Sequence, residues 1–297
     1  MDDAQEGMVR FELPDLCRLA DDGLAAVDMH LHTNHSDAPV PVEKALRKAS
    51  AEGYGIAVTD HNEVSGSLEA FARRGEVMVV PGIEISAADG PHILAYFYSP
   101  RDLGDFHRRH IAPNQRNSPW LAIRSGTQDI VDALEGYPCL KVAAHPYGYL
   151  IFNKGLQKCI DLEYLGPEIV DGFEGFEVVC GGMSHSQNLR AVDLVSRTGK
   201  CFTGGTDGHL LRDQGSVVTC ARATDHTEFL EAVERRENLV VGREKRALMK
   251  LATGTALMGK HSRYLLPSMR IHLEQNAPRV RHFMVRKVRR YRERNGR

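Results

Sequence analysis

The sequence predicts an α/β fold in which strands and helices alternate and the strands form a largely parallel sheet. Short apolar runs typical of strands alternate with stretches of helical periodicity from residue 25 to residue 242. Histidines and carboxylates recur at the ends of these runs. In parallel α/β sheets and barrels, that edge is where active sites form.

The first strand is expected at 25–32, where small and apolar residues lead into His30-Leu31-His32. A helix is expected at 42–52, because Val42 and Leu46 share a helical face and Gly53 follows as a stop signal. Further strands are predicted at 54–59, 76–80, 92–98, 139–144, 173–180, 201–206, 217–223 and 239–241, and further helices at 65–74, 127–134, 184–197 and 227–236.

The predicted domain spans 25–242, after a lead-in at 1–24 of uncertain structure. Residues 100–124 break the alternation, are rich in arginine, and are interpreted as an insertion or mobile lid. Residues 243–297 are expected to form a helical or partly disordered basic extension, with prolines at 267 and 278 as interruptions.

Composition indicates a globular protein, since 42% of the 297 residues are apolar and 26% are charged. The acidic N-terminus does not resemble a secretory signal, and no run approaches a membrane span. We therefore expect a cytoplasmic protein whose six scattered cysteines are reduced thiols.

Charge is distributed unevenly along the chain. Residues 279–297 hold nine Lys or Arg and one Glu, a net charge of +8, whereas the preceding 278 residues hold 29 basic and 38 acidic residues, a net charge of −9. This tail could track nucleic-acid phosphates, lie on an anionic membrane as an amphipathic helix, or be a solvated, disordered end.

His30 and His32 would point to the same face of a strand, so their imidazoles could hold one metal ion. Alone, the pair could equally be ordinary polar residues at a strand end. Further metal-competent side chains follow the other predicted strands, and Asp207-Gly208-His209 repeats the same spacing. The complete set is His30, His32, Asp37, His61, Glu84, His92, His145, Asp207 and His209.

These motifs resemble those of the polymerase-and-histidinol-phosphatase (PHP) family of metal-dependent phosphoesterases. The matching segments are 30–33 with 36–37, 59–62, 81–86, His92, 144–146 and 206–209, within 25–242. Ala38 departs from the family pattern, which usually has glycine there. The resemblance implies a distorted (β/α)7 barrel that commonly holds three metal ions.

The resemblance also implies how the ligands divide. His30, His32, Glu84 and Asp207 would hold one metal; Glu84, His92 and His145 a second; and Asp37, His61 and His209 a third. Manganese, zinc and iron all suit such a donor set.

The expected activity is hydrolysis of a phosphomonoester or a small nucleotide-like phosphate by a metal-activated hydroxide in a trinuclear site. The candidates for binding the substrate's phosphate are Arg116, Arg124 and Lys154. The candidates for orienting the imidazole ligands by hydrogen bonds are Asp28 and Asp60. Two alternatives remain: a non-catalytic scaffold that binds nucleic acid or membrane through its basic tail, and a 3′–5′ exonuclease.

Overall fold

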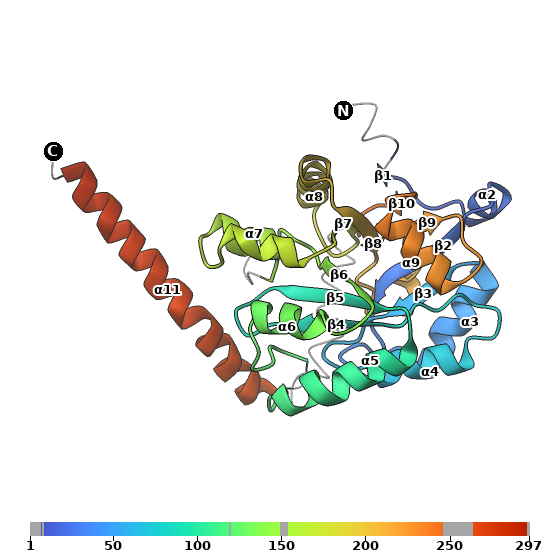
Figure 1. Cartoon of the computed structure of the whole chain (residues 1–297), viewed down its shortest axis with the longest axis horizontal. Coiled ribbons are helices and arrows are strands. Elements are labelled where there is room, and N and C mark those ends of the chain that lie inside the picture. Colours follow the sequence, from blue (N-terminus) through green and yellow to red (C-terminus); the bar gives the residue numbers. More distant parts are fainter. Residues whose placement is uncertain (1–6, 8, 119, 149–153, 246–263, 296–297) are drawn as a thin grey trace.

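The computed structural model describes residues 7, 9–118, 120–148, 154–245 and 264–295, whose strands form two five-stranded sheets (Figure 1). The first sheet has the order β1 (Val9–Arg10), β10 (Asn238–Gly242), β9 (Val217–Ala221), β2 (Ala25–Leu31) and β3 (Gly55–Val58). The second has the order β4 (Gly82–Ser86), β5 (His92–Phe97), β6 (Cys139–Ala143), β7 (Gly175–Cys180) and β8 (Cys201–Gly205).

Parallel and antiparallel pairs are mixed, which corrects the expectation of a largely parallel sheet. β2 pairs with β3, and β6 with β7 and β7 with β8, in parallel. In contrast, β5 is antiparallel to both β4 and β6, and β9 is antiparallel to both β10 and β2. The fold is therefore mixed α/β.

The two sheets do not close into a barrel. Within the described ranges, isolated bridges join the β2–β3 side of the first sheet to residues in or beside β4 and β8 of the second: Leu31 with Gly208, Ile56 with Val79, and His61 with Glu84. Of the strand predicted at 76–80, only Val79 forms a bridge, with Ile56. The continuous strand in this part of the chain is β4, which begins later, at Gly82. A (β/α)7 barrel is thus not confirmed, because single bridges replace continuous ladders at these edges.

Five helices agree with the periodicity of the sequence. They are α3 (Val42–Glu52), α4 (Ser65–Arg73), α6 (Thr127–Leu134), α8 (His185–Thr198) and α9 (His226–Glu234). α3 ends at Gly53, whose φ of 77° is left-handed and whose N–H donates to the Ala49 carbonyl. Val42, Ala45, Leu46 and Ala49 form its buried face, as the sequence pattern predicts.

The lead-in and the insertion are both structured. The lead-in contains β1 and α2 (Leu16–Asp21). The insertion contains α5 (Pro100–Phe106), a π-helical turn (His107–Ile111) and a 3-10 turn (Ala112–Asn114). Leu103, Phe106 and Ile111 are buried in the main hydrophobic core. This packing gives the insertion a structural role, and its action as a lid remains a prediction.

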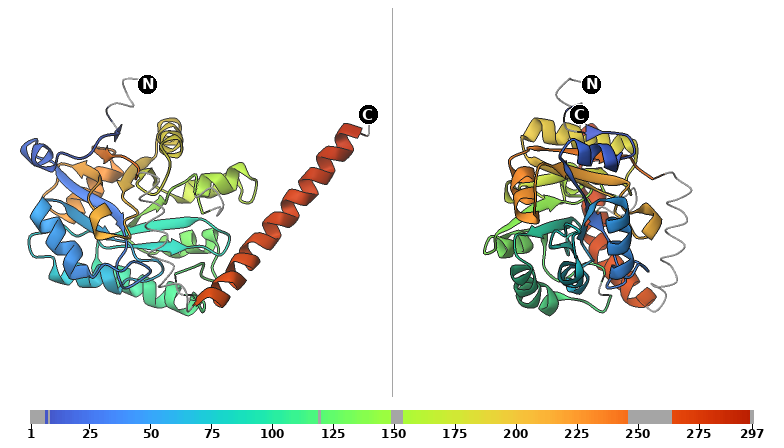
Figure 2. Two further views of the ribbon diagram at one scale, coloured as in Figure 1. Left: turned by 180° about the vertical axis from the view of Figure 1, so that it is seen from behind. Right: turned by 90° about the vertical axis from the view of Figure 1, so that its right-hand side faces the viewer.

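Among the described residues after the insertion, two further α-helices lie outside the regular alternation: α7 (Leu156–Asp161) and the long C-terminal α11 (Leu265–Asn295). α11 leaves the body at its base and projects away from it (Figures 1 and 2). It continues through Pro267 and Pro278, contrary to the expected interruptions. Proline is tolerated in a first helical turn, whereas Pro278 removes one helical hydrogen bond. Within the extension predicted at 243–297, residues 246–263 and 296–297 lie outside the described residues.

No helix within the described ranges combines the length and apolar character that crossing a membrane requires.

Candidate metal centre

All nine predicted ligands are buried, and none is more than 8% exposed. His32, His61, His145 and Asp207 follow β2, β3, β6 and β8, respectively. His92 instead begins β5, but β5 is antiparallel to β6, so its first residue lies at the same edge as the end of β6. Strand direction therefore explains how residues before and after strands converge.

Glu84, in the middle of β4, lies at the centre of the cluster. Its Oε1 is 2.8 Å from Nδ1 of His92 and 3.2 Å from Nε2 of His145. Its Oε2 is 3.4 Å from Nε2 of both His30 and His32. One carboxylate thus faces two groups of imidazoles, the arrangement needed to bridge two cations.

Two aspartates, Asp207 and Asp37, also contact histidines of the cluster. Oδ1 of Asp207 lies 3.3 Å from Nε2 of His32 and 3.5 Å from Nδ1 of His209. Oδ2 of Asp37 lies 3.2 Å from Nε2 of His209 and 3.7 Å from Nε2 of His61. His209 therefore lies between the two aspartates and links them.

Eight of the nine predicted ligands form three overlapping groups, each with its ligand atoms within 4.8 Å of one another, and His145 belongs to none of the three. The groups are His32, Asp37, His61 and His209; His30, His32 and Asp207; and His61, Glu84 and His92. The sequence prediction gives His32 and His61 one metal each, whereas the structure places each of them in two groups. The division of ligands among three ions stays a prediction.

Several buried polar atoms in the cluster fit a cation. Nε2 of His30, Nε2 of His32 and Oε2 of Glu84 have no hydrogen-bond partner within the described ranges. Leaving such atoms unsatisfied costs free energy, and native proteins rarely do so. Imidazole nitrogens and carboxylate oxygens that face one another are donors that zinc, manganese and iron accept. The residues present therefore fit divalent metal ions.

The electrostatics keep the three carboxylates in their binding form. Burial alone would raise the pKa of Glu84, Asp37 and Asp207, but the surrounding histidines outweigh it and hold each pKa well below its usual range. Burial and the neighbouring His209 and His61 lower the pKa of His32 to about 4. At neutral pH the three carboxylates are thus ionised and His32 is neutral, whereas Asp37 outweighs the effect of burial and raises the pKa of His209 to about 9, so a metal ion bound there would displace a proton.

Three backbone positions at the centre are left-handed: Asn62 (φ 52°), His145 (φ 29°) and Asp207 (φ 47°). Non-glycine residues rarely adopt this conformation, and each instance costs about 1–3 kcal/mol. Two of the three are predicted ligands and the third follows His61. Strain concentrated in this way is typical of a functional site.

Asp28 positions backbone instead of an imidazole ring. It accepts hydrogen bonds from the N–H of Thr206 (2.9 Å), the hydroxyl of Thr206 (2.7 Å) and the N–H of Gly215 (2.9 Å). It therefore ties β2 to the loop that carries Asp207 and His209.

Asp60 has the equivalent role for the loop that carries Asp37. It accepts from the N–H of Thr33 at 2.7 Å and from the hydroxyls of Thr33 and Ser36, each at 2.5 Å. The hypothesis that Asp28 and Asp60 orient imidazoles is replaced by one in which they fix the two ligand loops.

Glu177, in β7, contacts the cluster but is not among the residues that the sequence predicts for the site. One of its oxygens lies 2.9 Å from Nδ1 of His30, and the other accepts from the N–H of His145 at 2.7 Å. It is 1% exposed. A single glutamate inside the apolar run Phe176–Cys180 is the one sequence signal that could have identified it.

Gly205, at the end of β8, lets this strand lie directly against His30. A Cβ at this position would come within 2.4 Å of both N and Cβ of His30. Only glycine permits this approach, so the position of the His30 ring depends on it.

The three candidate phosphate contacts differ in position. Arg116 pairs with Glu274 of α11 at 2.5 Å, and Arg124 donates to the Gln115 carbonyl at 2.6 Å. Lys154 is beside the cluster: its carbonyl accepts from the N–H of His92 at 2.9 Å. After burial, the Lys154 charge is the next cause that lowers the pKa of His92. Substrate contact by any of the three stays a prediction.

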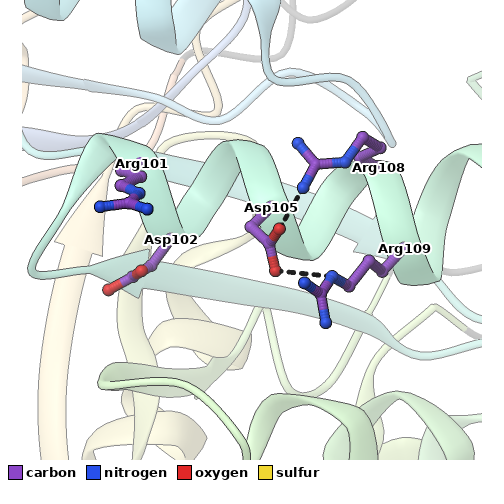
Figure 3. A pocket seen from close by; sticks show the side chains of 5 residues that line it. All are labelled: Arg101, Asp102, Asp105, Arg108 and Arg109. Carbon is purple, nitrogen blue, oxygen red and sulfur yellow. Dashed lines mark hydrogen bonds and ion pairs between the residues drawn. The ribbon is translucent and has the colours of Figure 1, made fainter.

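A surface depression on α5 and the following π-helical turn lies outside the ligand cluster (Figure 3). Arg101, Asp102, Asp105, Arg108 and Arg109 line it, and Asp105 pairs with both Arg108 and Arg109. These two ion pairs join residues three and four positions apart along the chain, as is common on helix surfaces.

Comparison with known proteins finds one matching family model and several solved structures of similar fold. Residues 185–238 match the family model described as PHP-associated. No curated protein matches the sequence. Several solved structures share the fold, at low sequence identity.

Three of these structures are informative. A protein from Bifidobacterium adolescentis, assigned as a metal-dependent phosphoesterase, is 22% identical with a TM-score of 0.50, covering 67% of this chain and 90% of its own. A two-domain protein from Bacteroides vulgatus, assigned as containing a PHP-like metal-dependent phosphoesterase, is 16% identical with a TM-score of 0.54, covering 79% and 69%. Endonuclease Q, bound to a 27-mer duplex with an abasic lesion, is 13% identical with a TM-score of 0.59, covering 74% and 60%.

Proposed function

We propose that this chain, a PHP-family protein as its fold and its PHP-associated segment indicate, is a metal-dependent phosphoesterase. The observation that carries the proposal is the buried cluster around Glu84, in which Nε2 of His30, Nε2 of His32 and Oε2 of Glu84 face one another and have no hydrogen-bond partner among the described residues. A protein that uses this fold only as a scaffold would gain nothing from so many buried, unsatisfied polar atoms.

In this proposal, nine side chains hold divalent metal ions. The number of ions, three, is taken by analogy with the family. The ligands are His30, His32, Asp37, His61, Glu84, His92, His145, Asp207 and His209. Bound metals would supply Lewis acidity toward phosphoryl oxygens and a nucleophile from water at neutral pH. Glu84 offers one oxygen to each side of the cluster, and its negative charge offsets repulsion between neighbouring cations.

Among the three candidate phosphate contacts, we favour Lys154. Its charge is close enough to His92 to lower the pKa of that ligand, so it would also act on an anion bound at the centre. Arg116 and Arg124 are weaker candidates, because each already has a partner in the insertion or in α11.

A nuclease is the second candidate. The fold is similar to that of endonuclease Q, which was solved with an abasic-site duplex, although the chain spans only about 60% of the length of that protein. The basic segment 279–297 could contribute charge to nucleic-acid binding. A small phosphomonoester is favoured, because the catalytic cluster by itself requires no extended polymer.

The test is a substrate screen with purified full chain in the presence of Mn²⁺, Zn²⁺ or Fe²⁺. Substrates are an aryl phosphate, nucleotides, sugar phosphates, histidinol phosphate, single-stranded DNA and abasic-site duplex. The His30→Ala/His32→Ala double variant is assayed in parallel. We expect metal-dependent phosphate release from at least one monoester by the native chain and none by the variant.

Cleavage confined to the DNA substrates would favour the nuclease. Inactivity on every substrate, in protein shown to contain metal, would favour the non-catalytic scaffold.

A further inference from the structure

α11 exposes an apolar stripe from Leu266 to Val288. Nine large apolar side chains of the described residues are exposed, and seven of them are on this helix. Six of the seven, together with exposed Ala277, follow a regular pattern: Leu266, Met269, Leu273, Ala277, Val280, Met284 and Val288. The spacing is three, four and four residues, repeated once, so the pattern has an eleven-residue period.

This period keeps the stripe straight. Eleven residues in three turns correspond to about 3.67 residues per turn, close to the 3.6 of an α-helix. The stripe therefore runs nearly parallel to the helix axis instead of winding around it. From Leu266 to Val288 it is roughly 33 Å long, at about 1.5 Å per residue. All the apolar side chains of a straight stripe can contact one flat surface at the same time.

The body of the protein holds the opposite side of the helix. Ile271 is 3% exposed, the hydroxyls of Ser268 and Ser118 are 3.1 Å apart, and Gln275 donates to the carbonyls of Ala87 and Ala88, each at 3.2 Å. Met269 and Leu273 each lie two residues from Ile271, and positions two apart are about 200° apart around a helix. At its base, α11 is therefore docked by one face and carries the stripe on the other.

The outer half of the same helix is strongly basic. Residues 279–297 carry a net charge of +8, whereas residues 1–278 carry −9. Exposed Arg281 and Lys287 lie on this half, among the apolar positions Val280, Met284 and Val288.

We propose that α11 binds the surface of an anionic phospholipid bilayer, with the apolar stripe in the headgroup boundary and the basic residues against lipid phosphates. Helices that combine an apolar stripe with many Lys or Arg and low overall hydrophobicity bind membranes in this way. The helix lies on the bilayer and does not span it, in agreement with its polar composition.

Two other occupants fit less well. Nucleic acid accounts for the charge but not for the stripe, because contacts to phosphates need cations and no apolar side chains. A parallel pair of α11 helices from two copies would cover the stripe but would bring two tails of charge +8 together.

Flotation of the full chain with vesicles tests the proposal without any assay of activity. We expect binding to vesicles of phosphatidylcholine with phosphatidylserine, little binding to phosphatidylcholine alone, and weakening by salt. The stripe variant Val280→Asn/Met284→Gln/Val288→Asn should bind at least about tenfold more weakly. The charge variant Arg281→Glu/Lys287→Glu should show a similar loss.

Val285→Asn is the matched control, because Val285 is 61% exposed on the same helix but lies about 100° from Met284, off the stripe. It should bind like the native chain, and circular dichroism should show equal helix content in all variants.

Several results would overturn the proposal. They are equal binding to neutral and anionic vesicles, no binding to either, or equal losses for the stripe variant and the Val285 control. Duplex DNA binding that depends on charge but not on the stripe, without vesicle binding, would identify nucleic acid as the occupant. A dimer in sedimentation that the stripe variant disperses, again without vesicle binding, would identify a second copy.

Discussion

Glu177 contacts two predicted metal ligands. One oxygen of its carboxylate lies 2.9 Å from Nδ1 of His30, and the other accepts a hydrogen bond from the backbone N–H of His145 at 2.7 Å. A hydrogen bond at Nδ1 fixes the orientation of the imidazole and leaves Nε2 as the metal-facing atom. Nε2 of His30 is the atom that lies toward Glu84 and Asp207. Glu177 is thus a positioning residue for the centre.

Glu177→Gln should lower the affinity for divalent metal about 10–100-fold, because it removes the charge that orients His30 and increases its basicity. Metal content after dialysis against graded chelator measures this effect, and thermal unfolding checks the fold. Glu174→Gln, which lies on the same part of the chain but pairs with Lys141 outside the cluster, serves as the control. Equal metal retention by both variants would contradict the role assigned to Glu177.

Gly205→Ala should destabilise the protein by about 1–3 kcal/mol, because the new methyl group would meet the His30 backbone at 2.4 Å. The shift of His30 should also weaken metal binding. Urea unfolding and metal titration measure the two effects. Gly104→Ala is the control: in helix α5 its Cβ would meet nothing nearer than 3.7 Å, so stability should rise by about 0.5–1 kcal/mol. If Gly205→Ala were as stable as the native chain, the prediction would be wrong, and β8 would be able to move away from His30 without loss of stability.

Lys154→Ala should raise the KM for a phosphomonoester about tenfold and change kcat little, because a lost charge contact to a ground-state phosphate weakens binding. Steady-state kinetics of metal-loaded protein separate the two constants. Lys44→Ala, at an exposed position on α3, should leave both unchanged. An unaltered KM in the Lys154 variant would place substrate binding elsewhere.

The cysteines should differ sharply in reactivity. Cys17 is exposed, whereas burial raises the pKa of Cys139, Cys201 and Cys220 to about 12. The thiolate is the reactive form, so a raised pKa suppresses alkylation until the pH approaches that value.

Iodoacetamide at pH 8 should therefore modify Cys17 in the native chain, and all six cysteines only after denaturation. Mass spectrometry of the digested protein locates the labels. Rapid native labelling of a buried cysteine would reveal an activated thiol that the structure does not explain.

Much of the candidate site can be predicted from the sequence, because its ligands occur in short motifs such as His30-Leu31-His32 and Asp207-Gly208-His209. Period-two spacing at a strand end already places two imidazoles side by side. The helices were predictable for a similar reason, since α3 and α6 carry their apolar residues on one face.

What the sequence did not reveal depends on contacts between distant segments. Glu177 and His30 are 147 residues apart, and nothing in the local pattern connects them. Strand direction could not be predicted either, because the apolar sequence of β5 is the same as that expected for a parallel strand. In the structure β5 is antiparallel to β6, and this direction places His92 at the site. The sharing of His32 and His61 between groups of ligands also depends on side-chain geometry, which spacing does not supply.

The most direct test of the central claim is aryl-phosphate hydrolysis by chelator-stripped protein before and after addition of Mn²⁺, Zn²⁺ or Fe²⁺. We expect no activity in the stripped chain, recovery with at least one metal, and no recovery in the His30→Ala/His32→Ala variant. Full activity in stripped protein, or in the variant, would contradict a metal-dependent phosphoesterase built around Glu84.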